Sequence, residues 1–298
     1  MRQMRWLVLG AWLGGAACGV RPDPIDVSVY DYRDTRELVR FVARAARALE
    51  QDGLEVLRDP ARCPVRAGDN YLYVYDLDNT CLFHAGMPDL VGKNLAEITD
   101  IEGKPVSRLV RVELANPENP HGWVHYTWWA PGKFHPVPKS SCNFQVKLPD
   151  GRDVFVGGGL DFPHEEREFV RIVVDSAVRL IEARGRDAIA TIADPAAGYQ
   201  YREVRVFAFQ PGGRLLISPV LGDSRIELDL AACVDETGHR PFERAMRLLE
   251  TEPHAWQIFM ARSRTERQLV KKILYLRKTV LDGEPLFVGA VTDLPQPP

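Results

Sequence analysis

A lysine and a histidine near several aromatic residues make one stretch of the chain the best candidate for ligand chemistry. Lys139 directly follows a proline-rich segment at residues 131–138, which we expect to be a loop that its prolines stiffen. An ammonium group presented there could pair with a carboxylate. His84 ends an expected strand and could donate a hydrogen bond to the same anion. These two residues predict a site for a small anionic molecule.

The aromatic residues that would wall this site lie in the expected strand at residues 122–130. Side chains alternate between the two faces of a strand, so Tyr126 and Trp128 share one face, and Trp123 and Trp129 share the other. Ligand pockets are mostly apolar with a few placed polar groups. We therefore take all four as candidate ligand contacts. The alternative that Trp123 and Trp129 fill the core stays open.

Other motifs argue against an enzyme or a metal protein. The glycines at 157–159 lack the strand-to-helix arrangement of a phosphate loop, and no Gly-x-Ser-x-Gly elbow occurs. His121, His125 and His135 form no close pair on one helical turn and have no acidic neighbour that would complete a metal site. We expect no catalytic activity, no metal and no cofactor.

Composition places the chain among ordinary globular proteins. Its 298 residues are 45% hydrophobic and 27% charged, with a net charge of −3. That balance gives no reason to expect nucleic-acid binding, which favours a basic face. Besides Cys18 there are four cysteines that allow three disulfide pairings, and free thiols are an equally open alternative: Cys63, Cys81, Cys142 and Cys233.

The composition of residues 1–18 predicts a secretory signal peptide. Arg2 and Arg5 precede an apolar run at residues 6–13, and small residues follow up to Cys18. This end resembles a bacterial lipoprotein cleavage site, which implies that Cys18 is acylated. Simple secretion after Ala17 is the alternative. No later apolar run has membrane-spanning length, so we expect the chain to work outside the cytoplasm.

The chain contains two copies of one plan. An offset of 135 residues carries Asp100 and Gly103 onto Asp235 and Gly238, and a slightly shorter offset carries Trp123 onto Trp256. Landmarks that keep their order at a fixed spacing indicate duplication.

Each copy has the same expected elements. A helix is followed by a hairpin, a short helix and three strands, which builds a five-stranded antiparallel sheet with helices packed on one side, an α+β fold. In the first copy the elements are residues 35–51, 71–83, 106–114, 122–130, 141–148 and 153–160. In the second copy they are residues 165–184, 203–218, 241–251, 255–263, 270–279 and 286–292.

The first copy carries a recognisable motif set. Gly122, Trp123, Tyr126, Trp128 and Pro131 fit a Gly-Trp-x-x-Tyr-x-Trp-x-x-Pro run, and Pro138-Lys139 fits a following Pro-Lys-x-x-Tyr motif, with Cys142 in place of the tyrosine. The set resembles the Cache family of PAS-like extracellular sensor domains, many of which bind small carboxylates such as acetate or pyruvate. The resemblance implies a ligand-binding Cache domain at residues 28–162 and a divergent, Cache-like copy at residues 163–294, each with a long N-terminal helix.

These expectations combine into one functional hypothesis. We expect a periplasmic-side sensor or solute-recognition lipoprotein that binds a small organic acid and is anchored to the bacterial outer membrane through Cys18. No signalling module follows, so its output would pass through a membrane-bound signalling or transport partner. The second copy carries Phe259 and Ala261 where the first has Tyr126 and Trp128, which indicates a structural or dimerising unit. The alternative is a structural envelope protein with no ligand.

Overall fold

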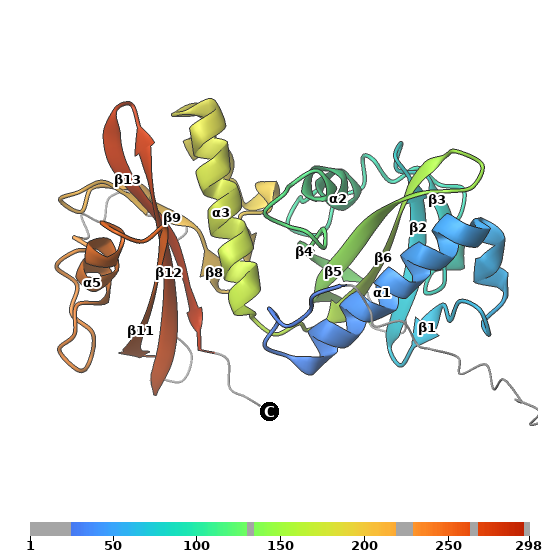
Figure 1. Ribbon diagram of the computed structural model, residues 1–298, viewed down its shortest axis with the longest axis horizontal. Coiled ribbons are helices and arrows are strands. Elements are labelled where there is room, and N and C mark those ends of the chain that lie inside the picture. Colours follow the sequence, from blue (N-terminus) through green and yellow to red (C-terminus); the bar gives the residue numbers. More distant parts are fainter. Residues whose placement is uncertain (1–24, 130–133, 219–228, 263–267, 295–298) are drawn as a thin grey trace, which may run out of the picture.

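The computed structural model describes residues 25–129, 134–218, 229–262 and 268–294. Two units lie side by side, each made of a twisted antiparallel sheet with a long helix against it (Figure 1). The predicted signal peptide and Cys18 fall outside the described residues.

The first unit is built on a six-stranded sheet. Its strands are β1 (Arg66–Ala67), β2 (Asn70–Asp76), β3 (Cys81–His84), β4 (Val124–Trp129), β5 (Pro136–Lys147) and β6 (Asp153–Asp161). The order across the sheet is β1-β2-β6-β5-β4, with β3 also paired to β2, and all pairings are antiparallel. The two-residue strand β1 makes this sheet one strand larger than expected.

Helices cover both faces of this sheet, so the expectation that they pack on one side was wrong. Helix α1 (Arg33–Asp52) buries Leu38, Val42, Ala45 and Leu49, which are spaced by three or four residues and form one apolar face. This face packs on β5 and β6. The short helix α2 (Val106–Leu114) packs on the opposite face. Because both faces of the strands carry large apolar side chains, both need a cover.

The second unit repeats the plan with a five-stranded sheet. Its strands are β9 (Phe207–Phe209), β10 (Leu215–Ile217), β11 (His254–Arg262), β12 (Leu269–Leu281) and β13 (Glu284–Asp293), in the order β10-β9-β13-β12-β11. Its helices are α3 (Arg167–Arg184), which packs on β12 and β13, and α5 (Pro241–Leu248), which packs on β11. The remaining elements of this unit are α4 (Asp187–Ala193), the 3₁₀ turn η3 (Pro195–Ala197), and the small strand pair β7 (Gln200–Tyr201) and β8 (Val204–Arg205). The first unit also has the 3₁₀ turns η1 (Leu54–Arg58) and η2 (Pro88–Leu90).

Numbered within each unit, the main strands of both sheets run in the order 2-1-5-4-3. The first unit reaches this order as β3-β2-β6-β5-β4, and the second as β10-β9-β13-β12-β11. The predicted α+β fold of two tandem PAS-like units, each with a long N-terminal helix, is confirmed.

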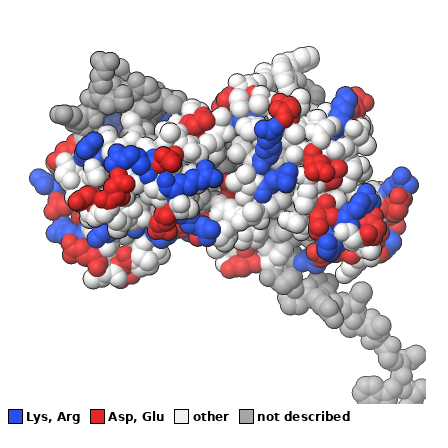
Figure 2. Space-filling view, turned by 90° about the horizontal axis from the view of Figure 1, so that it is seen from above, with Lys and Arg blue, Asp and Glu red and all other residues white. Residues whose placement is uncertain are grey.

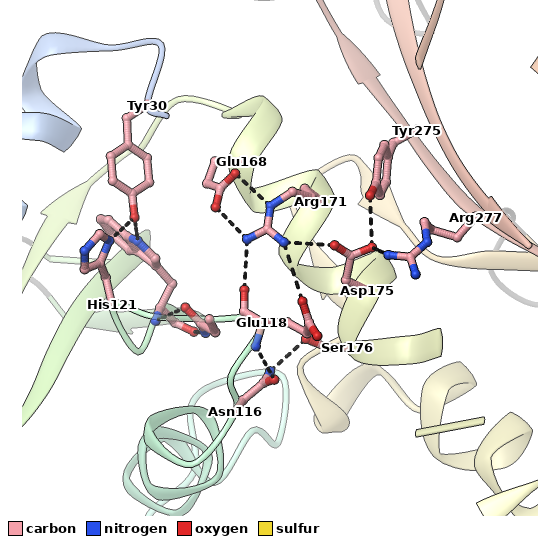
Figure 3. Close-up of polar contacts among 12 residues, drawn as sticks. Tyr30, Asn116, Glu118, His121, Glu168, Arg171, Asp175, Ser176, Tyr275 and Arg277 are labelled. Atoms are coloured by element: carbon pink, nitrogen blue, oxygen red, sulfur yellow. Dashed lines mark hydrogen bonds and ion pairs between the residues drawn. The ribbon is translucent and has the colours of Figure 1, made fainter. Parts of the chain in front are cut away.

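Helix α3 joins the units through a chain of polar contacts (Figure 3). The Arg171 guanidinium lies between Glu168 and Asp175 on its own helix and donates to the Glu118 carbonyl of the first unit at 3.0 Å. Asp175 in turn accepts from the Tyr275 hydroxyl at 3.0 Å and from Arg277 at 2.7 Å. The same helix therefore bonds both units.

Figure 2 shows Lys and Arg interspersed with Asp and Glu over the visible face of both units, with no large patch of one sign. Within the ranges that the structure describes, no helix is long and apolar enough to cross a membrane. Cys63, Cys81, Cys142 and Cys233 are free thiols, the first three of them buried.

Candidate functional site: an aromatic cavity in the first unit

A cavity of about 70 Å³ lies between the sheet of the first unit and the layer formed by α2 and the loop before it. An engineered cavity of about 150 Å³ holds benzene, so a molecule enclosed here has only a few non-hydrogen atoms. Its lining residues are Tyr71, Tyr73, Tyr75, His84, Leu90, Leu95, Ile98, Val106, Ser107, Val110, Tyr126, Trp128 and Phe155.

The sheet side of the cavity is a tyrosine wall that the sequence analysis did not assign to the site. Tyr71, Tyr73 and Tyr75 occupy alternate positions of β2 and therefore point to one face. The Tyr73 hydroxyl donates to Asn143 Oδ1 at 2.8 Å. A Cβ at Gly157 would meet the Tyr73 ring at 2.5 Å, so a glycine is required there for Tyr73 to lie close to the sheet. The Tyr-x-Tyr-x-Tyr alternation was the signal for this wall.

His84 lies in the cavity wall as a neutral hydrogen-bond donor. Its Nδ1 accepts the Met87 backbone N–H at 2.9 Å, which leaves the proton on Nε2. Burial, with help from the nearby charges of Lys139 and Arg66, lowers the pKa of His84 to about 4. At neutral pH the ring can thus donate one hydrogen bond without bringing a charge into the cavity.

Lys139 does not directly follow a loop as expected, because β5 already begins at Pro136. Pro136 and Pro138 are tolerated since they lie at the start of the strand, where a missing N–H disrupts the ladder least. The Lys139 ammonium pairs with the Asp161 carboxylate and lies 5.8 Å from the centre of the Tyr71 ring. It lies beside this ring on the same sheet face as Tyr126, at the margin of the cavity, and is not one of the residues that line the cavity.

The four aromatic candidates, three on β4 and Trp123 just before it, divide as the strand alternation predicted. Tyr126 and Trp128 line the cavity. Trp123 is buried on the opposite face, where its indole N–H donates to the Tyr30 hydroxyl at 2.7 Å. The centres of the Trp123 and Phe169 rings are 4.7 Å apart. Trp129 is 49% exposed. The structure therefore brings Tyr126, Trp128 and His84 together, and it places Trp123 and Trp129 elsewhere.

The second unit has a wider cavity, of about 390 Å³, between α5 and β11. Phe259 and Ala261 line it at the positions that match Tyr126 and Trp128, and Arg262 and two acidic residues stand near them. Its wall thus has a different chemistry from the tyrosine-rich wall of the first unit.

The first cavity presents uncharged groups to a guest. Burial raises the pKa of Tyr71 to about 12 and those of Tyr73, Tyr75 and Tyr126 further, so these hydroxyls stay protonated at neutral pH. In the described ranges, no group of three or more His, Cys, Asp or Glu side chains could hold a metal ion. The wall offers aromatic faces, neutral donors and apolar side chains to a small guest.

Fold and cavity together define a sensory ligand-binding class, and the comparisons name its family. The single Cache domain 2 family model matches residues 28–162. The periplasmic sensor domain of a chemotaxis protein is 31% identical over 44% of this chain and 89% of that chain, with a TM-score of 0.32.

Two further solved structures resemble this chain. A Cache chemosensory domain described for carboxylic acid recognition is 24% identical over 43% of this chain and 88% of that one, with a TM-score of 0.31. The ligand-binding domain of the Pseudomonas aeruginosa amino acid chemoreceptor PctB is 10% identical over 86% of this chain and 85% of that one, with a TM-score of 0.29. No curated protein matches the chain.

The chain belongs to the Cache family through its first unit. The matched residues and the identity to a periplasmic sensor domain carry this assignment. Cache domains are extracellular or periplasmic modules that sense small ligands, and they are not catalytic modules.

Proposed function

We propose that this chain is an exported ligand-binding Cache lipoprotein whose first unit, residues 28–162, recognises a small organic acid. The observation that carries the proposal is the cavity beside Tyr126, Trp128 and His84, which is open and not filled by the protein's own side chains. His84 supplies a neutral donor, and Lys139 supplies a positive charge at the margin of the cavity, beside Tyr71.

The second unit, residues 163–294, acts in this proposal as a structural or dimerising unit. Helix α3 ties it to the first unit through Arg171 and Asp175, so a change around the ligand can reach it. Acylation of Cys18 would hold the protein at the outer membrane on its periplasmic side. A membrane-bound signalling or transport protein would then receive the signal.

A thermal-shift screen of the whole chain against short carboxylic acids and amino acids tests this function. At least one compound should raise the melting temperature of the wild type, and the variant Tyr126→Ala should lose most of that shift. If no compound in the screen stabilises the wild type, the alternative of a structural envelope protein without a ligand is favoured.

A further inference from the structure

The ion pair of Lys139 and Asp161 is part of the same sheet face as the cavity wall. Tyr126, Lys139 and Asp161 are direct partners in neighbouring strands β4, β5 and β6, and cross-strand partners point to the same face. Lys139 is 4% exposed and Asp161 is partly exposed. The pair stands at the margin of the cavity, next to Tyr71 and Tyr126.

Asp161 changes what Lys139 can offer a ligand. Among the described residues that line the cavity, none carries a formal charge at neutral pH. The cations near its wall are Lys139 and Arg66. The Arg66 guanidinium donates to the Ala85 carbonyl, and the Lys139 ammonium already has a carboxylate partner in Asp161. A simple carboxylic acid would therefore compete with Asp161 for this ammonium, and displacing Asp161 would leave that carboxylate without its cation.

A ligand that carries both charges avoids this competition. Its carboxylate can approach Lys139 and the Nε2–H of His84, while its ammonium faces Asp161. Aromatic faces also attract cations, and Tyr71 and Tyr126 both border this place. Exchanging one ion pair for two matched ones buries no net charge.

We propose that Asp161 makes the first unit select a small zwitterion, with an ammonium and a carboxylate on the same carbon, over the matching monocarboxylic acid. This inference rests on the proposed function of the cavity and names its ligand class.

Calorimetric titration of the whole chain with two matched pairs tests the inference: glycine against acetate, and alanine against propionate. Each pair differs by the ammonium group alone. The wild type should bind the amino acid of at least one pair tenfold or more tightly than its partner. The variant Asp161→Asn, which frees Lys139, should bind the amino acid at least tenfold more weakly and the monocarboxylate more tightly.

The chain offers a matched control in Lys147 and Asp153, another cross-strand pair of β5 and β6 that is largely exposed at the far end of the ladder. Asp153→Asn should leave both affinities unchanged. Asp161→Glu keeps the negative charge and should keep the preference for the amino acid over the monocarboxylate. The comparison of ligands on the wild type does not depend on the folding of any variant.

The outcomes separate the inference from the function. A wild type that prefers acetate or propionate, or an Asp161→Asn variant whose affinities for both members of a pair change equally, overturns the inference and leaves the cavity's binding function standing. If neither the wild type nor Asp161→Asn binds any of the four compounds, the inference is overturned. If the wider screen of acids and amino acids also gives no binding, the proposed function falls as well.

Discussion

Asp100 and Asp235 hold equivalent places in the two units. The Asp100 carboxylate accepts the backbone N–H groups of Glu102 and Lys104 in its own turn, and that of Thr127 on β4 at 2.8 Å. The Asp235 carboxylate likewise accepts N–H groups from its turn, and that of Met260 on β11 at 3.0 Å. In the first unit this bond fastens the loop that roofs the cavity to the strand that carries Tyr126 and Trp128.

Replacing Asp100 should loosen that roof. Asp100→Ala leaves three backbone N–H groups without their acceptor, and we expect a loss of about 2 kcal/mol in the free energy of unfolding. Urea unfolding followed by tryptophan fluorescence measures it. Asp89→Ala, at an exposed site in the same part of the unit, serves as the control. Equal stability of the two variants would contradict the role given to Asp100.

Two adjacent tryptophans provide a test of the cavity wall. Trp128 lines the cavity, whereas Trp129 points away and is about half exposed. Trp128→Ala should weaken binding of a ligand found by thermal shift about tenfold or more, because an aromatic contact is lost. Trp129→Ala should change the affinity little. A loss in the Trp129 variant that matches the loss in the Trp128 variant would show that the ligand sits elsewhere.

Protonation of His84 should make the fold less stable in acid. The pKa of His84 is lowered by burial from 6.5 to about 4, so the unfolded chain takes up the proton first as the pH falls. The contribution of neutral His84 to the free energy of unfolding is complete above pH 6.5 and is lost as the pH falls to about 4. This loss is about 3 kcal/mol at most.

The variant His84→Gln isolates this contribution. Burial raises the pKa of Glu166 to about 7, so ionisation of this carboxyl lowers the free energy of unfolding as the pH rises. This effect is the same in the wild type and in His84→Gln, and it cancels when the two are compared. The difference in unfolding free energy between wild type and His84→Gln should therefore shrink or reverse in favour of the variant between pH 7 and pH 4.5. Parallel pH profiles would rule out a buried neutral His84.

Arg171 should fix the two units relative to each other. It links α3 to the Glu118 carbonyl of the first unit and supports Asp175, which holds Arg277 of the second (Figure 3). Arg171→Ala should lower the free energy of unfolding by about 2 kcal/mol and increase the radius of gyration in solution scattering. Arg58→Ala removes an exposed ion pair with Glu55 and should change neither the free energy of unfolding nor the radius of gyration.

Periodicity predicted much of this architecture. Helix α2 has the predicted bounds, and the alternation in β4 correctly separated Tyr126 and Trp128 from Trp123 and Trp129. The offset between Asp100 and Asp235 anticipated two matching turns. These signals are local, or repeat within the chain, and so can be read without a structure.

What the sequence did not predict depends on strand register. Asp161 lies 22 residues after Lys139, and only the pairing of β5 with β6 brings them together. The prolines before Lys139 indicated a loop, although the strand already includes them. The alternation of tyrosines in β2 predicts a strand. Their place opposite α2 depends on helices covering both faces of the sheet, which the alternation does not indicate.

A crystal structure of the whole chain grown with the best compound from the thermal-shift screen is the decisive test of ligand binding in the first unit. Ligand density is expected there between Tyr126 and His84, against the tyrosines of β2. Density for the compound only in the second unit, or an empty first cavity at saturating compound, would contradict it.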